Sequence, residues 1–170
     1  MERKYFKFLI FFFVILIITP LNSEEKVTYL NLDAVLNKTI IGMKIVKKLN
    51  DLKNVNLKQI NTKKKNIKNK EQDLVKKKNI LSKEEFETNL LALQKEIGIF
   101  NSEKNEKQIE YENIKKQELN NFTKMITPLI ESYIIKNSIS LVVNQNNIFI
   151  GNKKYDITND IINLIDNNLK

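Results

Sequence analysis

The chain has 170 residues and a formal net charge of +9, and it contains neither His nor Cys. It therefore lacks the commonest general base, the commonest transition-metal ligands and the thiol nucleophile, and it cannot form disulfides. Its three glycines are far apart in the sequence, so nothing supports a phosphate-binding loop or an ATP-driven mechanism. We expect no enzyme activity, no catalytic residues, no metal site and no cofactor.

The N-terminus has the organisation of an export signal. Three cations in the first seven residues precede residues 8–18, which are eleven uninterrupted apolar residues. This run is shorter than the roughly 20 residues that a membrane-spanning helix needs, and it suits the apolar region of a signal peptide. We predict cleavage after Ser23, which makes residues 1–23 the signal peptide. An uncleaved membrane anchor is the alternative, because Leu21 is a poor cleavage-site residue.

Short segments rich in β-formers lie near both ends of the mature chain. Residues 27–32 (VTYLNL) suit a strand, and a turn or short helix is expected to follow over residues 33–36. Residues 139–143 and 148–150 flank the polar sequence Gln145-Asn146-Asn147. Because Asn tolerates the left-handed turn conformation, this arrangement predicts a C-terminal β-hairpin.

A short helix is expected after that hairpin. Thr158 is a typical N-cap residue, and Asp160 would lie in the first turn, where negative charge is favourable. The apolar residues expected on its buried side are Ile161, Ile162 and Ile165. We assign residues 24–38 and 128–170 to a β body that also serves as the oligomerisation region.

The region between the β-like segments predicts long exposed helix. Residues 43–97 are 55 residues without Gly or Pro, and Lys dominates the first half. A stretch so free of helix breakers, with no long apolar run, is typical of exposed helix. Near its end, Thr127-Pro128 predicts a kink or a restart, because Pro removes a backbone donor.

One position divides this helical region. Ser82 and Glu85 have the spacing of a capping box, in which two backbone donors at a helix start are satisfied. The charge changes sign at the same place, from a net +9 over residues 53–83 to a net −4 over residues 84–118. We therefore predict an antiparallel helical-hairpin arm over residues 39–127 that folds back near Ser82. One continuous helix through Ser82 is the alternative.

Apolar spacing supports a coiled hairpin. The first helix places apolar residues seven apart, at Ile60, Ile67, Leu74 and Leu81. The second helix follows a 4-3-4-3 spacing, at Phe86, Leu90, Leu93, Ile97 and Phe100. Lys104 and Lys107 then occupy the same seam. Such a thin seam predicts flexible arms.

A single chain of this kind buries little apolar surface for so many ordered residues, and its few strands leave open edges. Oligomerisation of the body would resolve both problems. The expected fold is α+β, mostly α, with a small β body (strand 1 plus the C-terminal hairpin), a long antiparallel helical-hairpin arm and a short C-terminal helix. The residues expected to form the oligomer contacts are Val27, Tyr29, Leu141, Val143, Ile148 and Ile150.

The order and spacing of several short segments resemble the Skp (OmpH-type) family of periplasmic chaperones. The segments that carry the resemblance are residues 27–32, Val35-Leu36-Asn37, Gly42-x-Lys44, Pro128, Leu141-Val142-Val143, Ile148-Phe149-Ile150 and Asp156-Ile157-Thr158. They cover almost all of the mature chain. One departure is Asn137-Ser138, where the family often has Gly.

The resemblance implies a periplasmic homotrimer in which strands from three chains build the body and three helical hairpins surround a cavity. Unfolded outer-membrane β-barrel proteins would be held there and protected from aggregation without ATP. The resemblance leaves open whether anionic membrane lipid or lipopolysaccharide also binds. A basic surface would attract acidic clients, and scattered apolar residues would add adaptable contacts. The residues expected to contact clients are Lys63, Lys64, Lys65, Lys76, Lys77, Lys78, Phe86, Leu90 and Phe100.

Other interpretations of the same features stay open. The Lys run could be a plain solvated helix face, and the apolar arm residues could be ordinary coiled-coil seam. A specific nucleic-acid binder is not expected, because residues 53–83 contain no aromatic side chain to stack on a base. The main alternative function is a structural coiled-coil protein of the envelope, tethered to the membrane by an uncleaved apolar segment at residues 8–18.

Overall fold

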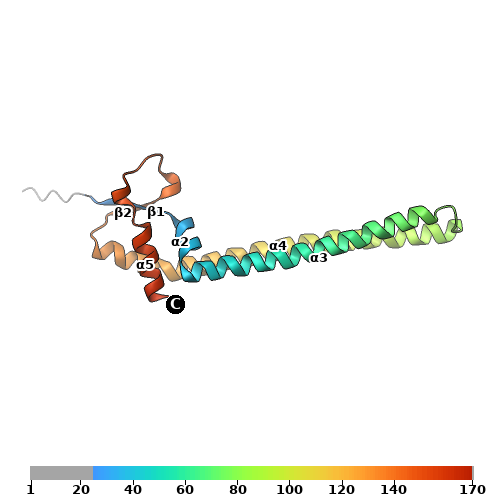
Figure 1. The fold of residues 1–170 in the computed structure, drawn as a ribbon, viewed down its shortest axis with the longest axis horizontal. Helices are drawn as coiled ribbons and strands as arrows, with labels where there is room; N and C mark the ends of the chain where they lie inside the picture. Colours follow the sequence, from blue (N-terminus) through green and yellow to red (C-terminus); the bar gives the residue numbers. More distant parts are fainter. Residues whose placement is uncertain (1–24, 170) are drawn as a thin grey trace, which may run out of the picture.

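In a computed structural model, which describes residues 25–169, the protein has a small body and one long helical arm (Figure 1). The fold class expected from the sequence, a mostly α protein with a small β body, is confirmed. The predicted signal peptide lies outside the described residues. In chain order, the elements are β1 (Val27–Leu30), α2 (Leu32–Lys38), α3 (Ile40–Lys77), α4 (Lys83–Lys136), β2 (Leu141–Asn144), the 3₁₀ turns η1 (Gln145–Asn147) and η2 (Lys153–Tyr155), and α5 (Thr158–Asn168).

The sheet of the body has two parallel strands, β1 and β2, in a register that pairs Val27 with Leu141. Parallel strands need a long crossover connection, and here the connection is the whole arm. On the other side of β1, Tyr29 forms an isolated bridge with Asp156, and its carbonyl accepts a hydrogen bond from the Ile157 N–H at 3.0 Å. Within residues 25–169, the outer edge of β2 therefore has no strand partner.

The predicted C-terminal hairpin is wrong. Only its first strand forms, because residues 148–150 pair with no strand in the described chain. The Asn-rich turn is instead tied to the junction of β1 and α2: Asn31 Nδ2 donates to Gln145 Oε1 at 2.6 Å, and Asn146 Nδ2 donates to Asp33 Oδ2 at 3.1 Å. These contacts draw the turn away from β2, so the chain does not return along that strand.

The core of the body forms where α5 packs against α2 and the ends of α3 and α4 nearest the body. Ile161 and Ile165 are fully buried and Ile162 is half-buried, which agrees with the predicted buried side of α5. The other buried core residues are Leu30, Val35, Ile45, Leu49, Phe122, Ile126, Ile139 and Ile157. This compact core anchors both helices of the arm at their body end.

The prediction that Thr158 caps α5 is wrong. The Thr158 hydroxyl accepts a hydrogen bond from the backbone N–H of Asn31 at 3.0 Å, which joins α5 to the end of β1. The first turn of α5 is supported instead by Asp156, whose carboxylate accepts from the Thr158 N–H at 2.9 Å. The carboxylate takes the capping role because the hydroxyl is committed to the strand.

Pro128 does not restart the helix, since α4 runs through it without interruption. Pro128 lies on the exposed face of α4, where water can satisfy the backbone carbonyl that loses its donor. The buried residues of this part of α4, Phe122 and Ile126, lie on the opposite face. A proline on the solvent side therefore leaves the packed face of the helix intact.

The junction between α2 and α3 is tightly packed. The Thr39 side chain is fully buried, accepts a hydrogen bond from the Gly42 N–H at 3.2 Å, and donates to the Val35 carbonyl at 2.8 Å. A Cβ at Gly42 would collide with the Leu36 carbonyl. Glycine is therefore required here for α3 to leave the body in the direction of the arm.

The C-terminus of α4 ends in a left-handed residue that is not glycine. Ser138 has φ 50°, its N–H donates to the Ile135 carbonyl, and the Ile139 N–H donates to the Ile134 carbonyl. This pair of hydrogen bonds is a Schellman motif, whose left-handed position usually carries Gly. Serine at this position costs backbone energy that Gly would avoid.

We therefore expect Ser138→Gly to raise the free energy of unfolding by about 1 kcal/mol, because it relieves the left-handed strain. Chemical denaturation followed by circular dichroism measures the change. Ser140→Gly is the matched control, because Ser140 lacks a positive φ and the same substitution should not stabilise it. Equal effects of the two substitutions would show that Ser138 is not strained.

Candidate functional site

The arm is the candidate functional site, and its two helices reverse direction at Ser82. The Ser82 hydroxyl accepts from the Glu85 N–H at 3.3 Å, and the Glu85 carboxylate accepts from the Ser82 N–H at 2.9 Å. The predicted capping box is therefore present. The hydrogen bonds from the Ser82 side chain and backbone lower the pKa of Glu85. This carboxylate stays ionised in the first turn of α4, where it opposes the helix dipole.

Ion pairs across the arm follow one antiparallel register. Lys70 pairs with Glu96 at 2.7 Å, and seven residues further from the tip along each helix Lys63 pairs with Glu103. Fifteen residues beyond that, on both helices, Lys48 pairs with Glu118 at 2.6 Å. The basic α3 and the acidic part of α4 thus meet in matched pairs. Because these groups are largely exposed, each pair contributes only a few tenths of a kcal/mol to stability. Their main effect is to fix the register of the two helices.

The apolar seam between the helices is thin. The predicted seam residues of the first helix, Ile60, Ile67, Leu74 and Leu81, are all only half-buried. On α4, Leu93 is the only residue of the outer half of the arm that is classed as buried. Lys104 is exposed and Lys107 is half-buried at seam positions. The outer arm is therefore held by weak contacts, in contrast to the body and to the end of the arm that packs against it.

The predicted client-contacting residues fall into two groups along the arm. By the register of the ion pairs, Lys63–Lys65 lie beside Phe100 in the middle of the arm, and Lys76–Lys78 lie near Phe86 and Leu90 at the tip. Phe86 and Phe100 are half-buried in the seam, whereas Leu90 is exposed. Lys63 is committed to Glu103, and Lys76 lies 3.6 Å from Asp73. Of the six predicted client-contacting lysines, four have no ion pair in the described chain, namely Lys64, Lys65, Lys77 and Lys78.

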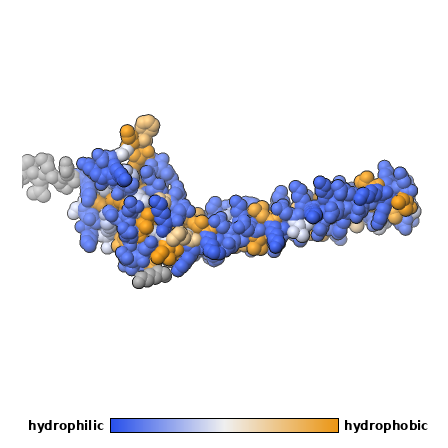
Figure 2. Space-filling model, viewed as in Figure 1, coloured by the Kyte–Doolittle hydropathy of each residue, from blue (hydrophilic) through white to orange (hydrophobic). Residues whose placement is uncertain are grey.

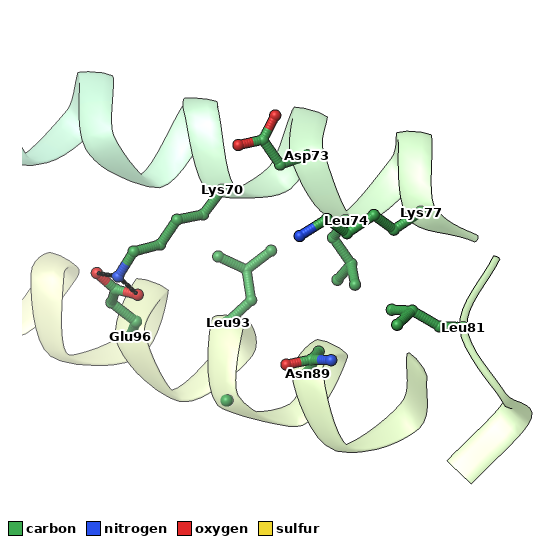
Figure 3. Close-up of a pocket in the computed structure, with 9 residues that line it drawn as sticks. Lys70, Asp73, Leu74, Lys77, Leu81, Asn89, Leu93 and Glu96 are labelled. Atoms are coloured by element: carbon green, nitrogen blue, oxygen red, sulfur yellow. Dashed lines mark hydrogen bonds and ion pairs between the residues drawn. The ribbon is translucent and has the colours of Figure 1, made fainter. Parts of the chain in front are cut away.

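A pocket between the helices near the tip was not expected from the sequence. Its volume is about 420 Å³, and Figure 3 shows Leu74, Leu81 and Leu93 pointing into it, with charged side chains around them. Its lining residues are Lys70, Asp73, Leu74, Lys77, Leu81, Asn89, Ala92, Leu93 and Glu96. The available signal was Ala92, which the register places across from Leu74. A small residue facing a large one leaves a space that heptad counting alone does not show.

The predicted oligomerisation residues all lie around the body, but they do not form one strand pair. Val27, Leu141 and Ile150 are exposed, whereas Tyr29, Val143 and Ile148 are half-buried. Figure 2 shows an apolar projection on top of the body. The loop after β2 contains Phe149, which is fully exposed. This loop and the open edge of β2 leave apolar surface and backbone hydrogen-bonding groups without partners in the described chain.

No group of three or more His, Cys, Asp or Glu residues within residues 25–169 could hold a metal ion. Burial and a hydrogen bond of 2.7 Å to Asp160 raise the pKa of Tyr133 to about 12, which keeps the phenol protonated at ordinary pH. Among the described helices, none combines the length and apolarity needed to cross a bilayer.

Comparisons with known proteins match a family model and several solved structures. The family model described as "Outer membrane protein (OmpH-like)" matches residues 26–165. A crystal structure from Caulobacter crescentus CB15, of a protein proposed to be an outer membrane chaperone (OmpH-like), has a TM-score of 0.74 with 15% sequence identity, and the match covers 86% of each chain. A search of curated proteins finds no match. At this identity the structural similarity concerns the fold.

Proposed function

Because this chain belongs to the OmpH-like outer membrane protein family, we propose that it is a chaperone that holds unfolded outer-membrane β-barrel proteins without ATP. The family match confirms the resemblance drawn from the sequence. The proposed chaperone is periplasmic, with residues 1–23 removed as a signal peptide. It acts by binding its clients between arms and by shielding them from aggregation.

The observation that carries this proposal is the arm. It extends far from the body (Figure 1), and α3 alone, with 38 residues at about 1.5 Å each, reaches roughly 57 Å. The outer part of the arm contributes nothing to the core of the body, yet it presents a large surface with mixed apolar and charged character. Weak seam contacts allow it to adjust to clients of different size. This combination suits a protein that binds many unfolded chains with modest affinity.

We further propose that the body assembles three copies of the chain. The open edge of β2 has backbone groups that another strand can pair with, and such edges are normally paired or covered. The exposed apolar side chains of Leu141, Phe149 and Ile150 lie on β2 and on the loop that follows it. A neighbouring copy that covers this surface would place several arms around one space.

The decisive experiment measures the aggregation of an unfolded outer-membrane β-barrel protein after dilution from denaturant. Purified residues 24–170, without nucleotide, should suppress the light scattering at a ratio of about one oligomer per client. Fractionation of the full-length protein should recover a soluble periplasmic product that begins near Glu24. Scattering that proceeds unchanged, or a full-length protein that stays in the membrane, contradicts the proposal and favours a structural tether.

Client association should depend on the four predicted client-contacting lysines that have no ion pair in the described chain. We expect the quadruple substitution of Lys64, Lys65, Lys77 and Lys78 by Gln to slow association with acidic clients severalfold at low salt. The reason is that clustered exposed charge steers encounter, and this attraction is screened beyond about 8 Å at 0.15 M ionic strength. Stopped-flow fluorescence of a labelled client against ionic strength measures the rate.

A matched control separates the position of the charge from the net charge. Substituting Gln at Lys115, Lys116, Lys124 and Lys136 removes the same charge from exposed positions closer to the body. This control should retain nearly the wild-type rate and salt dependence. Equal slopes for both quadruple variants would mean that the lysines of the outer arm are only a solvated face.

A further inference from the structure

The pocket at the arm tip has an apolar floor and a charged rim. Leu74 from α3, Leu93 from α4 and Leu81 from the turn form the floor (Figure 3). The volume of about 420 Å³ lies within the range of roughly 300–1,000 Å³ typical of small-ligand sites. The pocket is therefore large enough for a large side chain from another molecule.

Small and polar residues beside the seam leave this space open. The register of the ion pairs places Ala92 across from Leu74 and Asn89 across from Lys77. Ala92 is too small to fill the space beside Leu74, and the polar pair nearer the turn does not close it. The gap does not stabilise the arm, because a larger apolar residue at position 92 would bury more of the leucine floor.

The rim has one cation without a partner. The Lys70 ammonium contacts both oxygens of Glu96, at 2.8 and 2.7 Å, and Asp73 lies 3.6 Å from Lys76. Lys77 has no ion pair and no side-chain hydrogen bond in the described part of the chain. Figure 3 shows its side chain running back along α3 past Leu74. A ligand that fits this arrangement carries an anion next to its apolar group.

Exposed apolar side chains also occur on the outer arm. Ile80 in the turn is 80% exposed, and Val75 and Leu91 are each 66% exposed. None of these three residues lines the pocket, and Figure 2 shows apolar residues at the far end of the arm. An extended polypeptide that places one side chain in the pocket could therefore meet further apolar surface at the tip.

We infer that this pocket binds a segment of unfolded polypeptide that presents one large apolar side chain next to Asp or Glu. The inference rests on the proposed function and names the kind of client sequence that the arm recognises. The apolar side chain would displace water from the three leucines, and the neighbouring carboxylate would pair with Lys77. Charge complementarity thus selects the polypeptide segment, and the leucine floor holds it.

The test uses residues 24–170 and a short fluorescein-labelled peptide of Gly and Ser with one central Asp-Phe-Asp triplet. Binding should shift the methyl NMR signals of Leu74, Leu81 and Leu93, and fluorescence anisotropy gives Kd. Ala92→Leu should fill the pocket and weaken binding about tenfold or more, because the Phe side chain loses its burial. Lys77→Gln should weaken binding about threefold at low salt, as expected for an exposed ion pair.

Lys95→Gln is the matched control, because it removes the same charge from an exposed position next to Glu96 without altering the pocket lining, and it should leave Kd unchanged. Peptides with Lys-Phe-Lys or Asp-Ser-Asp should bind much more weakly. Unshifted leucine methyl signals, or wild-type affinity in Ala92→Leu, would overturn the inference. It would also be overturned if vesicles with phosphatidylglycerol shift these methyl signals and the peptide does not.

The peptide-binding test of the pocket and the aggregation test of the proposed function can fail independently. Failure of the wild-type protein to prevent aggregation, together with tight peptide binding, would reject the chaperone proposal and keep the pocket. Aggregation suppressed by wild-type protein, with no peptide binding at the tip, would reject the pocket alone. Ala92→Leu is expected to fold, because Leu is a good helix former at this exposed position.

Discussion

Leu141→Asp should convert the assembled protein into a folded monomer. Leu141 is 54% exposed in the single chain and begins β2, whose outer edge has no partner in the described residues. The substitution should therefore leave the chain's own core intact. In an assembly through this edge, the carboxylate would be buried without a partner, at a cost of about 3 kcal/mol or more. Sedimentation velocity, with circular dichroism as a check on folding, measures the outcome.

Leu91→Asp is the matched control for this experiment. It introduces the same charge in place of the same side chain, at a position on the arm that is 66% exposed. The control should sediment as the wild-type oligomer does. A wild-type protein that is already a folded monomer at micromolar concentration would contradict assembly through the body, and so would a Leu141→Asp variant that remains fully assembled.

The arm was largely predictable because its signals are local. The capping box at Ser82 needs only two residues at fixed spacing, and the absence of Gly and Pro over residues 43–97 is visible without any tertiary contact. The change of charge sign at the same place indicated the fold-back, and the ion pairs of Lys63 and Lys70 show its physical basis. A long segment with strong apolar periodicity is compatible with few other secondary structures.

The body was less predictable because its strand pairing is not local. The sequence around Asn146 is a good turn, but the side chains of Asn31 and Asp33, more than a hundred residues away, hold that turn. Thr158 was a good capping residue, yet its hydroxyl binds the backbone of Asn31. Both errors arose because a local preference was overridden by contacts between the two ends of the chain.

The tip pocket was missed for a different reason. Heptad counting records which positions are apolar, but it does not consider the size of the residues beside the seam. Ala92 and Leu74 become opposed only once the register is known, and the ion pairs define it. The exposure of Leu90, and the half-burial of Phe86 and Phe100, likewise depend on which side of each helix faces its neighbour.

Shortening the arm should abolish client holding without disturbing the body. We propose to remove residues 64–102 and to join Lys63 to Glu103 by a short Gly-containing turn. The remaining helices keep their register, because Lys63 and Glu103 already form an ion pair across the arm. The deletion removes about 30 Å of reach, since α4 loses 20 residues from its start at Lys83. The core residues around α5 are untouched.

Three measurements decide this prediction. Sedimentation should show the wild-type oligomeric state, thermal unfolding should show a retained body, and the aggregation assay should show no protection of the β-barrel client. The matched control removes residues 64–104 instead, which joins Lys63 to Asn105 and shifts α4 by two residues. Because two residues turn a helix of 3.6 residues per turn by about 200°, the apolar face of α4 would point away from α3, and this arm stub should be less protected in hydrogen exchange than the in-register stub. If the in-register variant protects the client as well as the intact chain does, the outer arm is not the part that holds it, and the exposed apolar surface of the body must do so.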